Sequence, residues 1–115
     1  MTEPTIDLAT FEELKETAGA EFVQELVDTF LVEAPSMLDE LRRALAAHNV
    51  DQFRRAAHSL KSNSNTFGAF ALAAMAKDLE LSAADCVRKS DAQPIDALAL
   101  EYSRVAAALT ELRRA

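Results

Sequence analysis

Residues 51–69 read DQFRRAAHSLKSNSNTFGA and contain the clearest periodic pattern in the chain. When this segment is placed on a helical wheel at about 100° per residue, its apolar and small residues gather on one face. Steps of three and four residues between such positions are typical of an amphipathic helix that packs against a core. The segment therefore predicts a helix over residues 51–67, with a core face made of Phe53, Ala56, Ala57, Leu60, Ser64 and Phe67.

His58 lies on the other side of this predicted helix, roughly 150° from the centre of the apolar stripe, so its ring should face solvent. The cations Arg54, Arg55 and Lys61 share its side or flank it. Cations beside an imidazole favour its neutral, nucleophilic form, and they can bind phosphoryl oxygens by charge-assisted hydrogen bonds. Ser62, one turn along, is small enough to leave the ring accessible. An ordinary surface histidine among solvated charges is the alternative that the wheel leaves open.

The segments before this helix are also predicted to be helical. Thr10 and Glu13 have the spacing of a capping box, and Gly19 should end a first short helix. A second helix is expected from about Ala20 to Ala47. Its apolar positions keep steps of three and four through Pro35, which predicts a kinked but continuous helix. His48 follows at its end, where the side chain can meet the last carbonyl groups.

Two more helices complete the pattern. A fourth should start after Gly68, and a fifth should have Pro94 in its first turn and Arg113 and Arg114 at its end. No segment has the alternation of β-branched residues that strands require. The sequence thus predicts an all-α fold, an up-down-up-down four-helix bundle with a short additional N-terminal helix, as one domain over residues 1–115.

Composition excludes several functional classes. The 115 residues suffice for one domain, and the net charge of -7 argues against nucleic acid or an anionic membrane as the main partner. The chain has no run of eighteen apolar residues and no signal-peptide pattern, so a cytoplasmic protein is expected. The single Cys86 lies on an apolar helical stretch and should be a buried thiol.

The segment that starts at His58 resembles the signature of the histidine-containing phosphotransfer (HPt) family. In that family a phosphorylatable histidine is followed by Leu-Lys, a small residue and, ten positions after the histidine, a glycine. Here these positions are Leu60, Lys61, Ser62 and Gly68. The likeness extends over nearly the whole chain, through Ala56-Ala57, the segment FLVEAP at residues 30–35, and Leu79-Glu80.

The resemblance implies a role for each matching residue. His58 would be the phosphoacceptor, Lys61 would bind phosphoryl oxygens, and Gly68 would form a turn that lets two helices pack closely. Ser62 stands where glycine is commonest in the family, so transfer rate or partner choice could differ. Roles for Arg54 and Arg55, in receiver docking or phosphoryl stabilisation, follow from the helical geometry alone.

The resemblance also implies partners. These would be response-regulator receiver domains, which supply the aspartate and an Mg²⁺-binding pocket, or a hybrid histidine kinase. The chain itself should need no metal and no cofactor, should lack autonomous kinase activity, and should be a monomer. Its Met1 start favours a stand-alone protein over an excised part of a larger kinase. Docking should use the first short helix and the exposed edges of the second and third helices.

Three other functions are alternatives to this one. A kinase dimerisation domain usually has an acidic residue after its histidine and a proline soon after, but here Ser59 follows and the next proline is Pro94. A four-helix metal carrier would place Glu three residues before each histidine, where this chain has Leu45 and Arg55. A metal-free helical-bundle adaptor remains open, and it would tolerate the loss of His58.

Overall fold

The computed structural model describes residues 5–114, and these residues form six helices and no strand. The all-α prediction is confirmed, but one more helix is present than the five expected. None of the helices in this described range is long and apolar enough to span a membrane. The helices are α1 (Leu8–Ala18), α2 (Ala20–Ala46), α3 (Val50–Thr66), α4 (Phe70–Leu81), α5 (Ala83–Lys89) and α6 (Gln93–Arg114).

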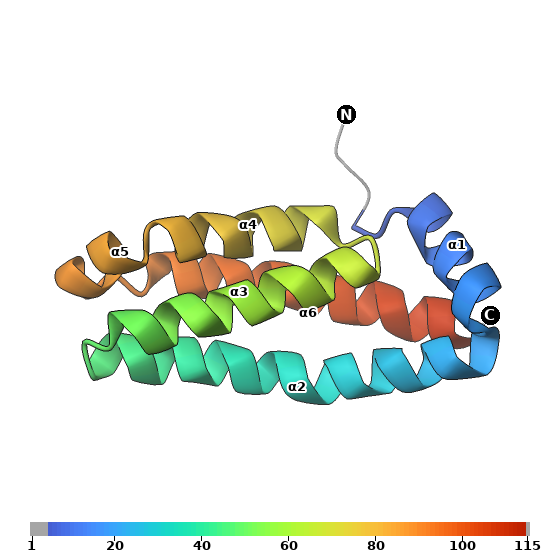
Figure 1. Cartoon of the computed structure of the whole chain (residues 1–115), viewed down its shortest axis with the longest axis horizontal. Helices are drawn as coiled ribbons and strands as arrows, with labels where there is room; N and C mark the ends of the chain where they lie inside the picture. The colour runs from blue at the N-terminus through green and yellow to red at the C-terminus, as the bar shows by residue number, and fades with distance from the viewer. Residues whose placement is uncertain (1–4, 115) are drawn as a thin grey trace.

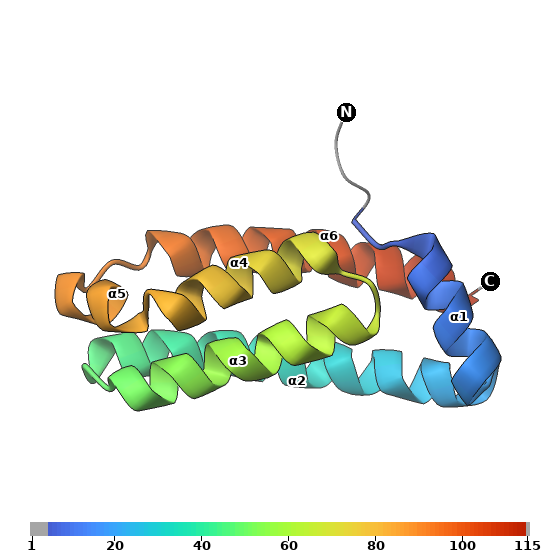
Figure 2. The ribbon, with the colours of Figure 1, turned by 45° about the horizontal axis from the view of Figure 1, so that its top comes forward.

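Four of these helices lie lengthwise beside one another (Figures 1 and 2). Helix α3 packs against α2 and α4, and α6 packs against the same two helices, so the four enclose a common core. Helix α1 covers the end where α2 begins and α6 ends, and α5 lies at the opposite end. The resulting molecule is elongated, with principal extents of 43 × 31 × 19 Å.

The core face predicted for α3 is confirmed. All six residues of that face are buried, among them Phe53 and Leu60, which are fully enclosed. The one polar member, Ser64, is also fully buried, but its hydroxyl donates to the Leu60 carbonyl at 2.7 Å. Because this hydrogen bond satisfies the hydroxyl, the core carries no penalty for an unpaired polar group there. The orientation of α3 is therefore fixed by burial, and its opposite face is left to solvent.

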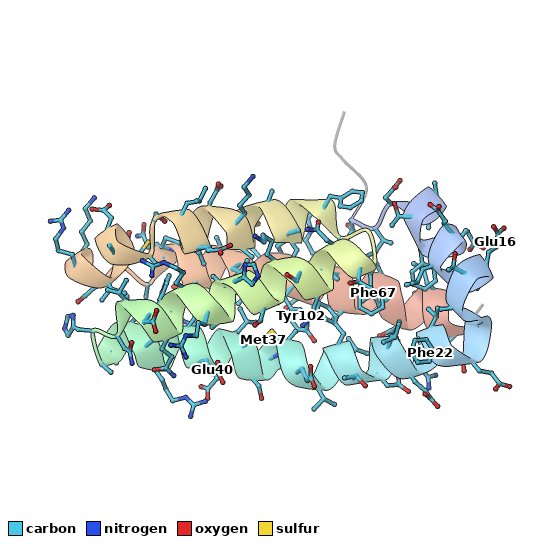
Figure 3. The ribbon with its side chains drawn as sticks, in the orientation of Figure 1. Glu16, Phe22, Met37, Glu40, Phe67 and Tyr102 are labelled. Atoms are coloured by element: carbon cyan, nitrogen blue, oxygen red, sulfur yellow. The ribbon has the colours of Figure 1, made fainter. Side chains whose placement is uncertain are left out.

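Helix α2 continues through Pro35 as predicted, over 27 residues. A proline has no N–H, so the carbonyl four residues earlier, that of Leu31, loses its helical partner. The structure supplies a substitute, because the Tyr102 hydroxyl of α6 donates to this carbonyl at 3.4 Å. Figure 3 shows Tyr102 reaching from α6 toward α2. Burial raises the pKa of Tyr102, so its hydroxyl keeps the proton that this bond needs.

The start of α1 differs from the prediction. The capping box at Thr10 and Glu13 is wrong, because the helix begins at Leu8 with Asp7 as its N-cap residue. Thr10 lies inside the first turn, and its hydroxyl donates to the Asp7 carboxylate at 2.5 Å. The end of the helix is as expected, since Gly19 follows it with a φ of 94°. A side chain would be strained at that angle, which explains the glycine.

The turn between α2 and α3 also corrects one detail. His48 was expected to cap α2 with its side chain, but its backbone N–H makes the contact, donating to the Leu45 carbonyl at 3.3 Å. The imidazole is exposed, and the backbone is left-handed there, with a φ of 55°. Asn49 then caps α3, where its side-chain oxygen accepts from the Gln52 N–H at 3.0 Å.

The extra helix arises because the predicted fourth segment is interrupted at Ser82. The Ser82 hydroxyl donates to the Asp78 carbonyl at 2.7 Å, beside the Ser82 N–H, which donates to the same oxygen at 3.0 Å. Serine hydroxyls that bond back in this way bend helices. The apolar stripe gave no sign of the break, because Leu79, Ala83 and Cys86 keep their phase and are all buried.

Candidate functional site

His58 lies near the middle of α3, on the face opposite the core. Its side chain is 57% exposed, whereas its neighbours Ala57 and Leu60 are buried. The predicted exposure of the ring is therefore confirmed. The helix on which it lies packs against both α2 and α4, so two neighbouring helices support the backbone that carries the ring.

Glu80 of α4 is the charged group in direct contact with His58. Its Oε2 lies 2.9 Å from His58 Nδ1, and its Oε1 accepts from Lys61 Nζ at 3.0 Å. His58 and Lys61 are three residues apart on α3, so they form neighbouring positions on one side of the helix. A single carboxylate thus joins the two α3 side chains across the α3–α4 interface.

The contacts of Glu80 with His58 and Lys61 determine its protonation state. Hydrogen bonding to Lys61, and to a smaller degree to His58, lowers the pKa of the Glu80 carboxyl below its ordinary value, against the opposing effect of desolvation. The group is therefore a carboxylate at neutral pH and has no proton to donate.

This carboxylate selects one tautomer of the histidine. Because Glu80 can only accept, His58 Nδ1 must carry the hydrogen of their contact. A neutral ring in that state has its lone pair on Nε2. Since the side chain is more than half exposed, the arrangement presents a ring nitrogen that can act as a nucleophile toward a group arriving from solvent.

The three cations expected around His58 are each paired with an acid. Lys61 binds Glu80, whereas Arg54 and Arg55 both pair with Asp51 in the first turn of α3, Arg54 at 3.8 Å. With His58 neutral, three cations against two carboxylates leave one positive charge. The positive charge predicted around His58 is thus much weaker than the sequence suggested, and the side chain that contacts the ring is acidic.

The other residues on this side of α3 and α4 are small or flexible. Ser62 is exposed and its side chain is small, as the sequence analysis required. Its backbone carbonyl accepts from the Thr66 hydroxyl at 3.2 Å. Lys77, whose direction the wheel left undecided, is exposed on α4 three residues before Glu80, so it lies along the same side of that helix.

Gly68 forms the expected turn between α3 and α4, two helices that pack against each other. The close approach that excludes a side chain there is, however, to Asp7 and Thr10 at the start of α1. A Cβ at this position would lie 3.0 Å from the Asp7 carbonyl oxygen and 3.0 Å from Thr10 Cβ. The Asp7 N–H also donates to the Gly68 carbonyl at 2.9 Å. The φ of 81° gives a second reason for glycine.

Two residues of the site were missed in the sequence. Asp51 could have been found, because Asp and Arg four residues apart on a predicted helix form an ion pair. Glu80 gave no local signal, since it lies 22 residues from His58 and meets it only through the packing of α4 on α3. Leu79-Glu80 was noted for its family likeness alone.

A groove between α2 and α3 lies on the side of α3 that faces α2; we call it the α2–α3 groove. It has a volume of about 120 Å³ and is lined by Leu26, Thr29, Phe30, Glu33, Asn63, Thr66 and Phe67. Asn63, one of the lining residues, also contacts Met37 Sδ of α2 through its amide at 3.9 Å. Figure 3 shows Met37 and Phe67 along this boundary, and Phe22, which is 51% exposed, further toward the start of α2.

The described residues offer no metal centre. No group of three or more His, Cys, Asp or Glu side chains in residues 5–114 is arranged to hold a metal ion. Cys86 is buried as predicted, 3.5 Å from the Ser82 hydroxyl.

Comparisons with known proteins point to one protein family. The model of the Hpt domain family matches residues 25–115. Among solved structures, the chain is similar to histidine-containing phosphotransfer protein B (HptB) from Pseudomonas aeruginosa PAO1. The sequence identity is 30%, the match covers 98% of this chain and 97% of that one, and the TM-score is 0.84. The search of curated proteins gives no match.

Proposed function

The chain belongs to the Hpt domain family, and on that premise we propose that His58 is the residue on which it carries the phosphoryl group. Members of this family are phosphocarriers rather than enzymes, and histidine phosphotransfer in a phosphorelay is the role of this chain. The observation that supports His58 is its exposed ring with Nδ1 bound to Glu80, which leaves Nε2 as the nucleophile. We expect no kinase activity of its own.

The reaction follows from this arrangement. The Nε2 lone pair of His58 attacks the phosphorus of an aspartyl phosphate on a receiver domain, a P–N bond forms, and the aspartate leaves as a carboxylate. The hydrogen on Nδ1 stays in place, so the ring becomes positively charged. Glu80, 2.9 Å from Nδ1, stabilises that charge. The same steps in reverse pass the phosphoryl group to the next receiver.

Lys61 is proposed to bind the phosphoryl oxygens. Its ammonium group has three donors, and one of them is used by Glu80 Oε1 in the unphosphorylated protein. Another can therefore donate to an oxygen of the transferred group without loss of the Glu80 contact. Ser62, exposed and small, leaves space for the incoming receiver and adds one hydroxyl to the edge of the site.

Receiver domains and histidine kinases are the partners of Hpt proteins. We propose that the receiver covers His58 and the neighbouring α2–α3 groove. Apolar contact would come from the half-exposed Phe22 of α2 and from Leu8 of α1, which is also exposed. Arg54 and Arg55 would meet the acidic rim of the receiver site. We propose a monomer that meets one receiver at a time.

The same proposal extends to the architecture. The four members of an up-down-up-down bundle would be α2, α3, the combined α4–α5 segment and α6, with α1 as the added N-terminal helix. The domain would comprise residues 1–115, of which the family model covers residues 25–115.

Transfer of radiolabelled phosphate tests the proposal. A panel of phosphorylated receiver domains should label the wild-type protein within seconds and should leave the His58→Gln variant unlabelled. The variant should melt at the wild-type temperature, because the side chain is exposed. Full labelling of a folded His58→Gln variant would reject His58 as the acceptor. An adaptor bundle, the alternative function, would take up no label in either form.

A further inference from the structure

Asp51 is placed to compete for the cations that a receiver would use. It lies in the first turn of α3, and its two carboxylate oxygens pair with Arg54 Nη1 and Arg55 Nη2 respectively. All three side chains are at least half exposed. The pairs lie within one helix, so they form without help from any neighbouring helix.

The position of this cluster matters for docking. Arg54 and Arg55 are the residues four and three positions before His58, so they occupy the turn next to the ring. The other cation near the ring, Lys61, is held by Glu80. The arginines are thus the two exposed cations of α3 next to the ring that can turn toward an acidic partner, and in the free protein both are engaged by one carboxylate.

We propose that Asp51 is a specificity-determining residue, an internal carboxylate that occupies Arg54 and Arg55 until a sufficiently acidic receiver surface displaces it. The inference rests on the proposed function and deepens it. A weakly acidic receiver surface gains little binding energy, because Arg54 and Arg55 must lose their contacts with Asp51 before they can pair with it. A receiver with a dense carboxylate cluster gains more than it loses, so Asp51 sharpens the choice between receivers.

Exposed ion pairs are weak, which sets the expected size of the effect. Their strength of at most ~1 kcal/mol corresponds to about fivefold in an equilibrium constant. The Asp51→Asn variant should therefore associate with an acidic receiver up to about fivefold faster at low salt, and the gain should shrink as salt is added.

The experiment is stopped-flow transfer from a phosphorylated receiver domain that labels the wild-type protein. Four proteins are compared with it: Asp51→Asn, Arg55→Gln, the double variant, and Asp39→Asn. The last is a matched control, because Asp39 forms the same i, i+4 pair with Arg43 on α2. Around α2, Asp39 lies roughly 160° from Met37, one of the residues that contact α3.

The double variant separates release of the arginine from a simple change of charge. Asp51→Asn should speed association in the wild-type background and have a smaller effect once Arg55 is Gln, because only Arg54 is then left to release. Equal gains from Asp51→Asn and Asp39→Asn would overturn the proposal, and so would a gain from Asp51→Asn that is equally large with and without Arg55. Melting curves recorded for each protein check that α3 stays folded. Whatever the association rates, label on His58 supports the proposed function, whereas a wild-type protein that takes up no label on His58 would reject that function.

Discussion

Replacing Glu80 by alanine should slow phosphoryl transfer about fivefold and leave the fold intact. The carboxylate accepts from His58 Nδ1 at 2.9 Å and from Lys61 Nζ at 3.0 Å. The His58 ring is more than half exposed, so solvent weakens its bond to about 1 kcal/mol, the upper limit for an exposed ion pair. Loss of about 1 kcal/mol of transition-state stabilisation corresponds to a rate about five times lower.

The physical reason is the position of the ring proton. Without Glu80 the ring can rotate, and its proton can reside on Nε2, where the lone pair is needed for attack. The positive charge that develops on the ring during transfer also loses its nearest carboxylate. Both effects act on the chemical step, so the rate at saturating receiver should fall more than the affinity for the receiver.

Single-turnover quench-flow with a phosphorylated receiver measures this step. Glu80→Gln is the informative companion, because its amide oxygen can still accept from Nδ1 but carries no charge, and we expect it to be intermediate. Asp85→Ala is the matched control. Asp85 also pairs with two cations, Arg88 and Lys89, but does so within α5. Its loss should leave the transfer rate unchanged.

Two results would refute the reasoning. Wild-type transfer by a folded Glu80→Ala variant would mean that Glu80 does not orient the ring, and the choice of Nε2 as nucleophile would lose its basis. Equal slowing by Glu80→Ala and Asp85→Ala would assign the effect to overall charge.

Three further predictions follow from the faces and charges of α3. Leu60→Ala should lower the free energy of unfolding by about 2–5 kcal/mol, whereas Lys61→Ala should lower it by at most about 1 kcal/mol but slow transfer. Denaturant melts and transfer assays measure the two effects, and the opposite result for the two variants would mean that the core and solvent faces are wrongly assigned. The lowered pKa of Glu80 means that its pairs stabilise the fold above its ordinary pKa of 4.5 and that this contribution is lost as pH falls through the lower folded value. Glu80→Gln should therefore lose less stability than wild type as pH falls below 4.5 in denaturant melts, and equal losses would contradict this. Arg55→Glu should reduce the association rate more than it changes the dissociation rate, as measured by stopped-flow experiments over a salt series. An association rate that changes neither with salt nor with this substitution would mean that docking depends on apolar contact.

The parts of the fold that could be predicted from sequence are those set by local periodicity. The core stripe of α3 was predicted because a period of 3.6 residues determines which side of an amphipathic helix is buried. The continuity of α2 through Pro35 was predicted for the same reason. The Tyr102 hydroxyl that compensates for this proline could not be foreseen, since it comes from a helix 71 residues away along the chain.

The parts that were missed depend on side-chain hydrogen bonds or on tertiary packing. The bend at Ser82 arises from one hydroxyl that bonds back to Asp78, and an apolar stripe cannot report it. The site was predicted as an exposed histidine among cations, and the exposure is confirmed. The pairing of those cations with Asp51 and Glu80 changes the charge of the site. Local sequence rules could have predicted the contact of Asp51, whereas that of Glu80 depends on tertiary packing.

The most direct test of the central claim is the chemical nature and position of the bound phosphoryl group. After incubation with a phosphorylated receiver, the label on this protein should be lost in acid and retained in base, as expected for a phosphoramidate. Peptide mapping by mass spectrometry under basic conditions should place it on His58. Label that survives acid, or label found on His48 or any other residue, would contradict the account.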